Sequence, residues 1–147
     1  MKISLACDHG GLELKQTVKE HLTELGHEVH DFGTFTKDSC DYPDFVRPAA
    51  EAVASGECER GIVICTTGIG VSIVANKVRG IRCALLTDTV AAYATRSHND
   101  TNMMALGQNI VAPYMALQIV DIWLSTPFSG GERHCRRIEK IAAMERQ

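Results

Sequence analysis

The sequence has no run of about 18 or more apolar residues, which excludes a helix that spans a membrane. It also lacks a long run of like charges, and the formal net charge of its 147 residues is only −3. Neither nucleic acid nor an anionic membrane is therefore expected as the main partner. Apolar residues make up 45% and charged residues 22% of the chain, a composition that excludes disorder and predicts one domain over residues 1–147.

Closely spaced cysteine pairs are absent as well. The six cysteines include no C-x-x-C, which excludes a zinc knuckle and a redox pair. The first residues, MKISLACDHGG, show neither the apolar run nor the small-residue cleavage pattern of a secretory signal. We therefore expect reduced thiols in the cytoplasm. His27 and His30 have no acidic or cysteine partner at ligand spacing, so no metal site is predicted.

The hydrophobic periodicity predicts strands and helices in alternation. The expected strands are residues 2–7, 27–32, 62–65, 81–86 and 103–106. The expected helices are residues 12–25, 44–55, 71–78, 88–98, 113–124 and 132–147, with caps at Asp44 and at Thr87 or Asp88. This alternation predicts a mainly parallel sheet with helices on both faces.

Polar residues follow several of these strands, and in such a sheet ligands bind beyond the carboxyl ends of the strands. Asp8 and His9 follow the first strand, residues 65–70 follow the third, and Asp88 follows the fourth. Residues 97–100 lie just before the fifth strand. These four segments are the candidates for a functional site.

The loop from Cys65 to Ser72, CTTGIGVS, is the strongest local signal. Gly68 and Gly70 allow a tight turn that presents amide N–H groups, and a helix N-terminus follows. Cys65 therefore lies beside positive potential, which favours the thiolate. The alternative is a buried cysteine at a strand end, followed by an ordinary turn into a helix. The local pattern alone does not choose between the two.

Several loop chemistries do not fit this pattern. A phosphatase nucleophile loop needs arginine six positions after the cysteine, where Val71 stands. A dinucleotide fingerprint needs a third glycine, where Ile73 stands, and the Gly-Lys-Ser/Thr of a nucleotide-binding P-loop is missing. A phosphocysteine carrier remains possible, although its cysteine usually follows the first strand and Cys65 follows the third.

Two polar segments could complete a site. Asp8 can exchange protons with sugar hydroxyls and His9 can bind phosphate, but Asp8 as a helix cap with an exposed His9 is the simpler interpretation. In the second segment His98 is a proton donor near neutral pH, and Asn99 can bind an enediolate oxygen. The alternative there is a histidine at a helix end, followed by a turn.

Arg133 and Arg137 lie four residues apart on the last expected helix, so they share a face. Two guanidinium groups on one face suit a phosphate group. For this stretch alone, a solvated charged helix paired with its own glutamates is the simpler interpretation.

Taken together, the segments resemble the B-type ribose-5-phosphate isomerase family, which also includes galactose-6-phosphate and allose-6-phosphate isomerases. The matching segments occur in the family's order over nearly the whole chain and are residues 7–9, 41–43, 65–70, 75–77, 80–82, 98–102 and 130–134, together with Arg137. The ordered set is far more specific than any one segment.

The resemblance implies a three-layer α/β/α sandwich with a five-stranded parallel, Rossmann-like sheet in the order 2-1-3-5-4 and a C-terminal helix. It also implies a homodimer or a dimer of dimers whose site is shared between subunits, a small phosphorylated sugar as substrate, and no metal or organic cofactor.

The resemblance also assigns roles to single residues. It makes Cys65 the base and His98 the ring-opening residue. The catalytic set is Cys65, His98, Thr67 and Asp8. The substrate-binding set is Asp8, His9, Thr66, Thr67, Gly68, Ile69, Gly70, Ser72, Asn99, Arg133 and Arg137, in which His9 and the two arginines are the phosphate contacts.

Two positions depart from the family's pattern. The family usually has glycine where Thr66 stands, and threonine adds bulk beside the base. Ribose-phosphate members often have arginine where Asn109 stands. Both departures bear on the identity of the sugar: ribose 5-phosphate is the first expectation, and a related hexose or tetrose phosphate is the second.

Overall fold

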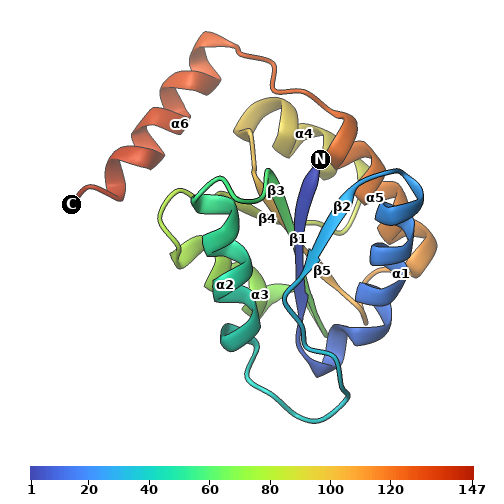
Figure 1. Ribbon diagram of the computed structural model, residues 1–147. Coiled ribbons are helices and arrows are strands. Elements are labelled where there is room, and N and C mark those ends of the chain that lie inside the picture. The colour runs from blue at the N-terminus through green and yellow to red at the C-terminus, as the bar shows by residue number, and fades with distance from the viewer.

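The computed structural model describes residues 1–147 and has three layers, with helices on both faces of one sheet (Figure 1). The strands in chain order are β1 (Lys2–Cys7), β2 (Glu28–Asp31), β3 (Arg60–Cys65), β4 (Cys83–Leu85) and β5 (Met103–Gly107). All neighbouring strands are parallel, in the order β2-β1-β3-β5-β4, which confirms the expected topology.

The chain also forms one short 3-10 helix and six α-helices, of which the last two follow β5. They are η1 (His9–Gly11), α1 (Leu12–Glu24), α2 (Tyr42–Ala54), α3 (Ile69–Lys77), α4 (Thr89–Asn99), α5 (Pro113–Ser125) and α6 (Glu132–Met144). Buried side chains of α1, α4 and α5 pack with one face of the sheet, around Trp123. Those of α2 and α3 pack with the other face, around Val63 and Cys65. The chain therefore has a separate apolar core on each side of the sheet.

Three helix ends show how well local signals predict boundaries. Asp88 caps α4 as expected, because its carboxylate accepts a 2.7 Å hydrogen bond from the Ala91 N–H. The cap expected at Asp44 is wrong: α2 begins at Tyr42, with Asp41 as the N-cap residue. Pro43 fits this first turn because the N–H that proline lacks would have no acceptor there.

The helix after the third strand begins two residues earlier than expected. Gly68 is left-handed, with φ 79°, so the chain turns there and α3 begins at Ile69. The glycines that the sequence suggested for a ligand loop therefore lie at the start of the helix.

The last helix stands apart from the two cores. It follows an extended segment after α5, lies at the outer edge of the molecule in Figure 1, and has no buried residue. Its apolar side chains Ile141 and Met144 are exposed. None of the helices has both the length and the apolar character needed to cross a membrane.

Candidate active site

Cys65 is the last residue of β3 and lies in the middle of the sheet, between β1 and β5. Its side chain is 5% exposed, and the Gly68 N–H donates a 3.1 Å hydrogen bond to its Sγ. The sulfur therefore lies within hydrogen-bond distance of a backbone donor at the start of α3. The turn into α3 thus orients the Cys65 side chain towards the backbone amides that follow it.

The first turn of α3 supplies further donors beside Cys65. The N–H groups of Gly70 and Val71 lie in this turn and have no acceptor within the helix. A Cβ at Gly70 would lie 2.7 Å from Cζ of Tyr42, so the Tyr42 ring lies directly against this turn. The helix start is therefore open to an anion, and an aromatic ring borders it.

Asp8 lies beside Cys65 at the end of the neighbouring strand, since Cys7 of β1 pairs with Ile64 of β3. Its Oδ1 accepts a 2.9 Å hydrogen bond from the Gly10 N–H, so the predicted capping role is confirmed. The carboxylate is 7% exposed and has a second oxygen for which no hydrogen bond is formed. Capping thus leaves Asp8 able to contact a substrate.

His9 projects from the same turn towards the loop that precedes α2. Its Nδ1 accepts a 3.3 Å hydrogen bond from the Cys40 N–H, and the Cys40 Sγ lies 3.8 Å from the same nitrogen. An Nδ1 that accepts from an amide carries no proton, so the proton is on Nε2. His9 can therefore donate from Nε2 as a neutral imidazole.

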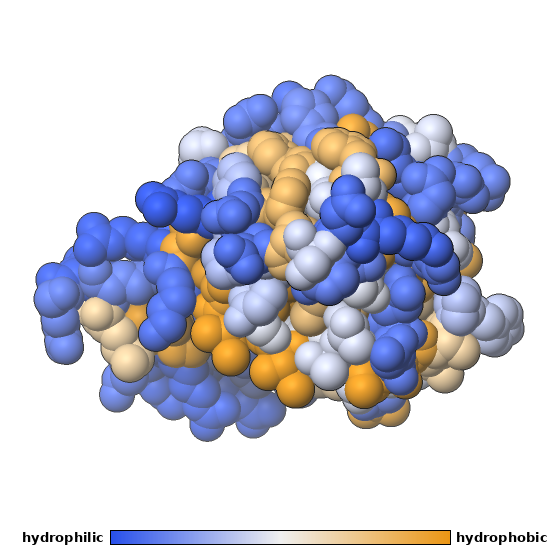
Figure 2. Space-filling model, turned by 90° about the horizontal axis from the view of Figure 1, so that it is seen from below, coloured by the Kyte–Doolittle hydropathy of each residue, from blue (hydrophilic) through white to orange (hydrophobic).

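Asp8 and His9 line one open cavity at the carboxyl edge of the sheet, next to the loop that follows Cys65. Its volume is about 590 Å³, and its walls are Asp8, His9, Cys40, Asp41, Tyr42, Pro43, Asp44 and Thr66. Figure 2 shows the molecule from this edge, where apolar surface alternates with hydrophilic surface. The size suits a small polar ligand such as a sugar phosphate.

The segment that follows β5 packs against the Cys65 loop. The Gln108 N–H bonds to the Cys65 carbonyl at 2.8 Å, and the Asn109 N–H bonds to the Thr66 carbonyl at 3.0 Å. A Cβ at Gly107 would lie 2.5 Å from the Thr67 carbonyl carbon, so only glycine allows this approach. Both departures from the family pattern, Thr66 and Asn109, are thus neighbours in space.

His98 and Asn99 lie at the opposite edge of the sheet. They end α4, which runs antiparallel to the strands, and Asn102, just after this end, accepts a 3.0 Å hydrogen bond from Gly61 near the start of β3. From Gly61 to Cys65 the strand rises by about 13 Å. Within one chain, His98 therefore does not share a site with Cys65.

The two candidate phosphate residues of α6 accompany His98. The rings of His98 and His134 stack at 4.6 Å with an interplanar angle of 8°, which brings the start of α6 to the end of α4. Desolvation, followed by the charges of His98, Arg133 and Arg137, lowers the pKa of His134. Arg133 and Arg137 are exposed on this helix.

The predicted residues thus form two groups. Asp8, His9 and residues 65–72 gather at the carboxyl edge, while His98, Asn99, Arg133 and Arg137 gather at the amino edge. Sequence reasoning assigned no role to Tyr42 or Cys40, although residues 41–43 are among the segments that match the family. No group of three or more His, Cys, Asp or Glu side chains is placed to hold a metal ion.

The fold and the carboxyl-edge cavity define an α/β protein in which a helix start with free backbone N–H groups lies beside a cysteine. Comparison with known proteins identifies the family within this class. The family model described as Ribose/Galactose Isomerase matches residues 3–141. The chain therefore belongs to the ribose/galactose isomerase family.

Three relatives cover almost the whole chain. The structure of ribose-5-phosphate isomerase B from Clostridium thermocellum has a TM-score of 0.97 and 53% identity, and covers 99% of this chain and 98% of its own. Ribose-5-phosphate isomerase B of Escherichia coli is 45% identical over 99% of this chain and 97% of its own length. The Mycoplasma genitalium ribose-5-phosphate isomerase B with bound ribulose-5-phosphate has a TM-score of 0.94 and 38% identity, and covers 99% of this chain and 97% of its own.

Proposed function

We propose that this chain interconverts ribose 5-phosphate and ribulose 5-phosphate, with Cys65 as the base. The observation that carries the proposal is the 3.1 Å hydrogen bond from the Gly68 N–H to Cys65 Sγ, at the floor of an anion-binding turn. Full-length similarity to ribose-5-phosphate isomerases B supports the substrate. The bound ribulose 5-phosphate in one of these relatives supports it further.

The reaction begins with anchoring and ring opening. His9 donates from Nε2 to the phosphate, and Arg133 and Arg137 of a second chain complete the phosphate contacts. His98 of the second chain then protonates the ring oxygen as its bond to C1 breaks, and the 1-hydroxyl gives its proton to solvent as the aldehyde forms. Asn99 beside it binds a sugar oxygen.

Proton transfer between carbons follows. The Cys65 thiolate takes the proton from C2 of the open aldose, and the electron pair of that C–H bond forms the cis-enediolate. Its negative charge is stabilised by the free N–H groups of Gly70 and Val71. Cys65 returns the proton to C1, and Asp8, Thr67 or His98 moves the hydroxyl proton between O1 and O2.

A homodimer, or a dimer of dimers, follows from the two separated groups of residues. A complete site needs the carboxyl edge of one chain and the amino edge of another. The exposed apolar face around the edge strand β4 supports such an assembly, because large apolar residues there have no cover in one chain. These residues are Ile69, Ile73, Leu85, Val90 and Tyr93, between 39% and 77% exposed.

The cellular compartment belongs to the same proposal. All six cysteines are free, which fits the reducing cytoplasm. A related hexose or tetrose phosphate is the second candidate substrate, and Thr66 with Asn109 is the observation that favours it. A phosphocysteine carrier is the least favoured, because Cys65 is 5% exposed and a carrier must offer its sulfur to a second protein.

The test is turnover of a panel of pentose, hexose and tetrose phosphates, with kcat and KM for each, by the wild type and by Cys65→Ala. We expect ribose 5-phosphate to give the highest kcat/KM. Cys65→Ala should lower kcat by about 1,000-fold or more, with the melting temperature retained. Cys135→Ala, at a half-buried cysteine of α6, is the matched control. Near-wild-type turnover by Cys65→Ala would overturn the assignment of the base.

Mixed dimers test the shared site. Chains with Cys65→Ala and chains with His98→Asn carry different affinity tags, and dimers that hold one of each are purified on both. Such a dimer contains one site with both wild-type residues, so about half of the wild-type activity should return. Activity no higher than that of the two parent variants contradicts the shared site.

A further inference from the structure

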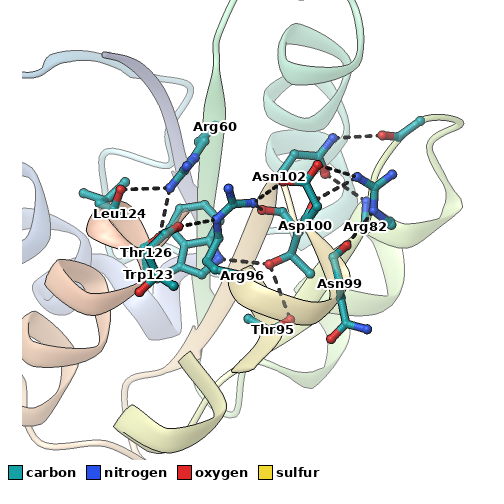
Figure 3. A network of polar contacts seen from close by, with 12 residues as sticks. Arg60, Arg82, Thr95, Arg96, Asn99, Asp100, Asn102, Trp123, Leu124 and Thr126 are labelled. Atoms are coloured by element: carbon teal, nitrogen blue, oxygen red, sulfur yellow. Dashed lines mark hydrogen bonds and ion pairs between the residues drawn. The ribbon is translucent and has the colours of Figure 1, made fainter. Parts of the chain in front are cut away.

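The turn Gly80–Arg82 lies between α3 and β4. It is one of the segments that match the family, but the proposed reaction uses none of its residues. The Arg82 side chain reaches the end of α4 (Figure 3). Its Nε donates a 3.0 Å hydrogen bond to the Asn99 carbonyl, and its Nη2 donates a 2.8 Å hydrogen bond to the Asp100 carbonyl. Arg82 therefore holds the backbone of the residues that directly follow His98.

These contacts satisfy groups that a helix end leaves without partners. The last carbonyls of a helix have no intrahelical donor. Asp100 ends α4 in the left-handed conformation, with φ 46°, which is uncommon for a residue other than glycine. The buried Arg96 side chain also contacts Asp100, since its Nη1 donates a 2.8 Å hydrogen bond to Asp100 Oδ1. Arg82 and Arg96 thus clamp this one turn from two sides.

The same turn also anchors the far end of α6. The Gly80 N–H donates to both carboxylate oxygens of Glu145, at 3.0 and 3.1 Å. Asn102 keeps the turn in place, since its side chain accepts from the Arg82 N–H and donates to the Gly80 carbonyl, each at 2.9 Å. Because α6 has no buried residue, Glu145 is one of its few attachments to the rest of the chain.

We propose that Arg82 and Glu145 are positioning residues that fix the amino-edge half of the active site. Arg82 sets the orientation of His98 and Asn99, and Glu145 sets the placement of α6 with its two arginines. The inference rests on the proposed function, in which this half serves the Cys65 of a second chain. Arg82 uses Nε and Nη2 on backbone carbonyls, so it acts through the α4 turn rather than on substrate.

The two positioning residues have different kinetic signatures. Arg82→Gln removes the clamp on the ring-opening residue, so kcat should fall by about 100-fold, the loss expected for a displacement of about 1 Å. Glu145→Ala loosens the helix that carries the phosphate contacts, so KM should rise with a smaller change in kcat. Arg79→Gln removes an equal charge three residues away, where Arg79 is exposed and its side chain forms no hydrogen bond, and should match the wild type.

Mixed dimers test whether Arg82 acts on the His98 of the same chain. In a dimer of one Arg82→Gln chain and one Cys65→Ala chain, one site combines an intact Cys65 edge with an intact amino edge. About half of the wild-type activity should return. The parallel dimer of His98→Asn and Cys65→Ala tests the shared site by itself, so failure of the parallel dimer defeats the proposed function.

If activity returns in the mixed dimer with the His98→Asn chain but not in the one with the Arg82→Gln chain, Arg82 does not act through the amino edge of its own chain. Wild-type kcat/KM in the Arg82→Gln homodimer would also overturn the inference. Should Arg82→Gln not fold, Arg82→Lys keeps one donor for the α4 carbonyls. It should give an intermediate kcat, which added guanidinium ion raises; a kcat equal to the wild type contradicts the role.

Discussion

The Asn109 N–H donates a 3.0 Å hydrogen bond to the carbonyl oxygen of Thr66, which joins the segment after β5 to the loop after β3. The family resemblance leads us to expect glycine at position 66 and, often in ribose-phosphate members, arginine at position 109. Because they are adjacent, a change at one alters the surroundings of the other. We therefore expect substrate preference to depend on the two residues together.

Restoring arginine at position 109 should strengthen phosphate binding. Asn109→Arg adds a guanidinium group next to the Thr66 backbone. We expect KM for ribose 5-phosphate to fall by about 10-fold, since hydrogen bonds to charged groups contribute about 1.5–3 kcal/mol. Steady-state kinetics on the sugar-phosphate panel measures this. Asn109→Gln, which adds length without charge, is the control. An unchanged KM for every sugar phosphate would show that position 109 does not face the phosphate.

Thr66 and Gly10 should behave as a coupled pair. A Cβ at Gly10 would collide with the Thr66 hydroxyl oxygen. Gly10→Ala should therefore destabilise the protein by about 1–2 kcal/mol and raise KM, because the Asp8–His9 turn shifts. Adding Thr66→Ala removes that oxygen and should restore most of the loss. Thermal melts and kinetics of the two single variants and the double variant give the coupling, and strictly additive effects would contradict it.

The buried Lys15 should matter far more than an exposed lysine. Lys15 Nζ lies 2.7 Å from Asp31 Oδ1, and the two side chains are 2% and 8% exposed. Lys15→Met leaves a buried carboxylate without its main partner, so we expect a loss of about 3 kcal/mol in unfolding free energy. Lys37→Met, whose pair with Glu13 lies in solvent, is the matched control with a loss below about 1 kcal/mol. Urea denaturation followed by circular dichroism measures both, and equal losses in unfolding free energy would contradict this prediction.

Asp31 also predicts how stability depends on pH. Burial acts to raise its pKa, but hydrogen bonds from Lys15, the Gly33 N–H and Lys19 outweigh burial, so the pKa is lowered. A lowered carboxyl pKa contributes stability above the unfolded value of about 3.9, and this contribution is lost as pH falls through the folded pKa. Unfolding free energies of the wild type and of Asp31→Asn should differ most near neutral pH and converge in acid. A constant difference down to pH 2 would contradict this.

Cys7 should resist thiol reagents while the protein is folded. Its side chain is fully buried, and burial raises the pKa of the thiol to about 12. At pH 8 only about one thiol in 10,000 is then ionised. Iodoacetamide followed by peptide mass spectrometry should find Cys7 unmodified in the native protein and modified in urea, while Cys135 reacts in both. Rapid native labelling of Cys7 would show that the β1 end opens.

Much of the fold is predictable because it depends on local signals. Four of the five strands lie where a short apolar run predicts them, whereas β2 (EVHD) is mostly polar. Gly26, which follows α1, has φ 87°, as expected of a residue after a helix end. The sheet order came from the family resemblance, since strand–helix alternation alone leaves the order open. The start of α2 differs from the prediction because Asp44 resembles a cap, whereas the helix begins at Tyr42 and Pro43 fits its first turn.

The candidate site was predictable only in part, because one sequence does not show which groups lie at the same edge. Cys65 and Asp8 end neighbouring parallel strands, so their proximity follows from topology. The hydrogen bond from the Cys40 N–H to His9 joins residues 31 positions apart across an irregular loop, and no periodicity predicts it. The proposed role of Arg82 is not predictable from the sequence for a similar reason, because its partners are backbone carbonyls of α4.

The only tryptophan of the chain gives the amino edge an optical signal of its own. Trp123 is fully buried, its indole N–H donates a 3.0 Å hydrogen bond to Thr101 just after α4, and the Arg60 guanidinium lies 5.2 Å from the centre of its ring. The carboxyl edge around Cys65 contains no such fluorophore. Tryptophan emission, excited at wavelengths that tyrosine does not absorb, therefore reports selectively on the half of the molecule that bears His98, and it can follow that half without an added label.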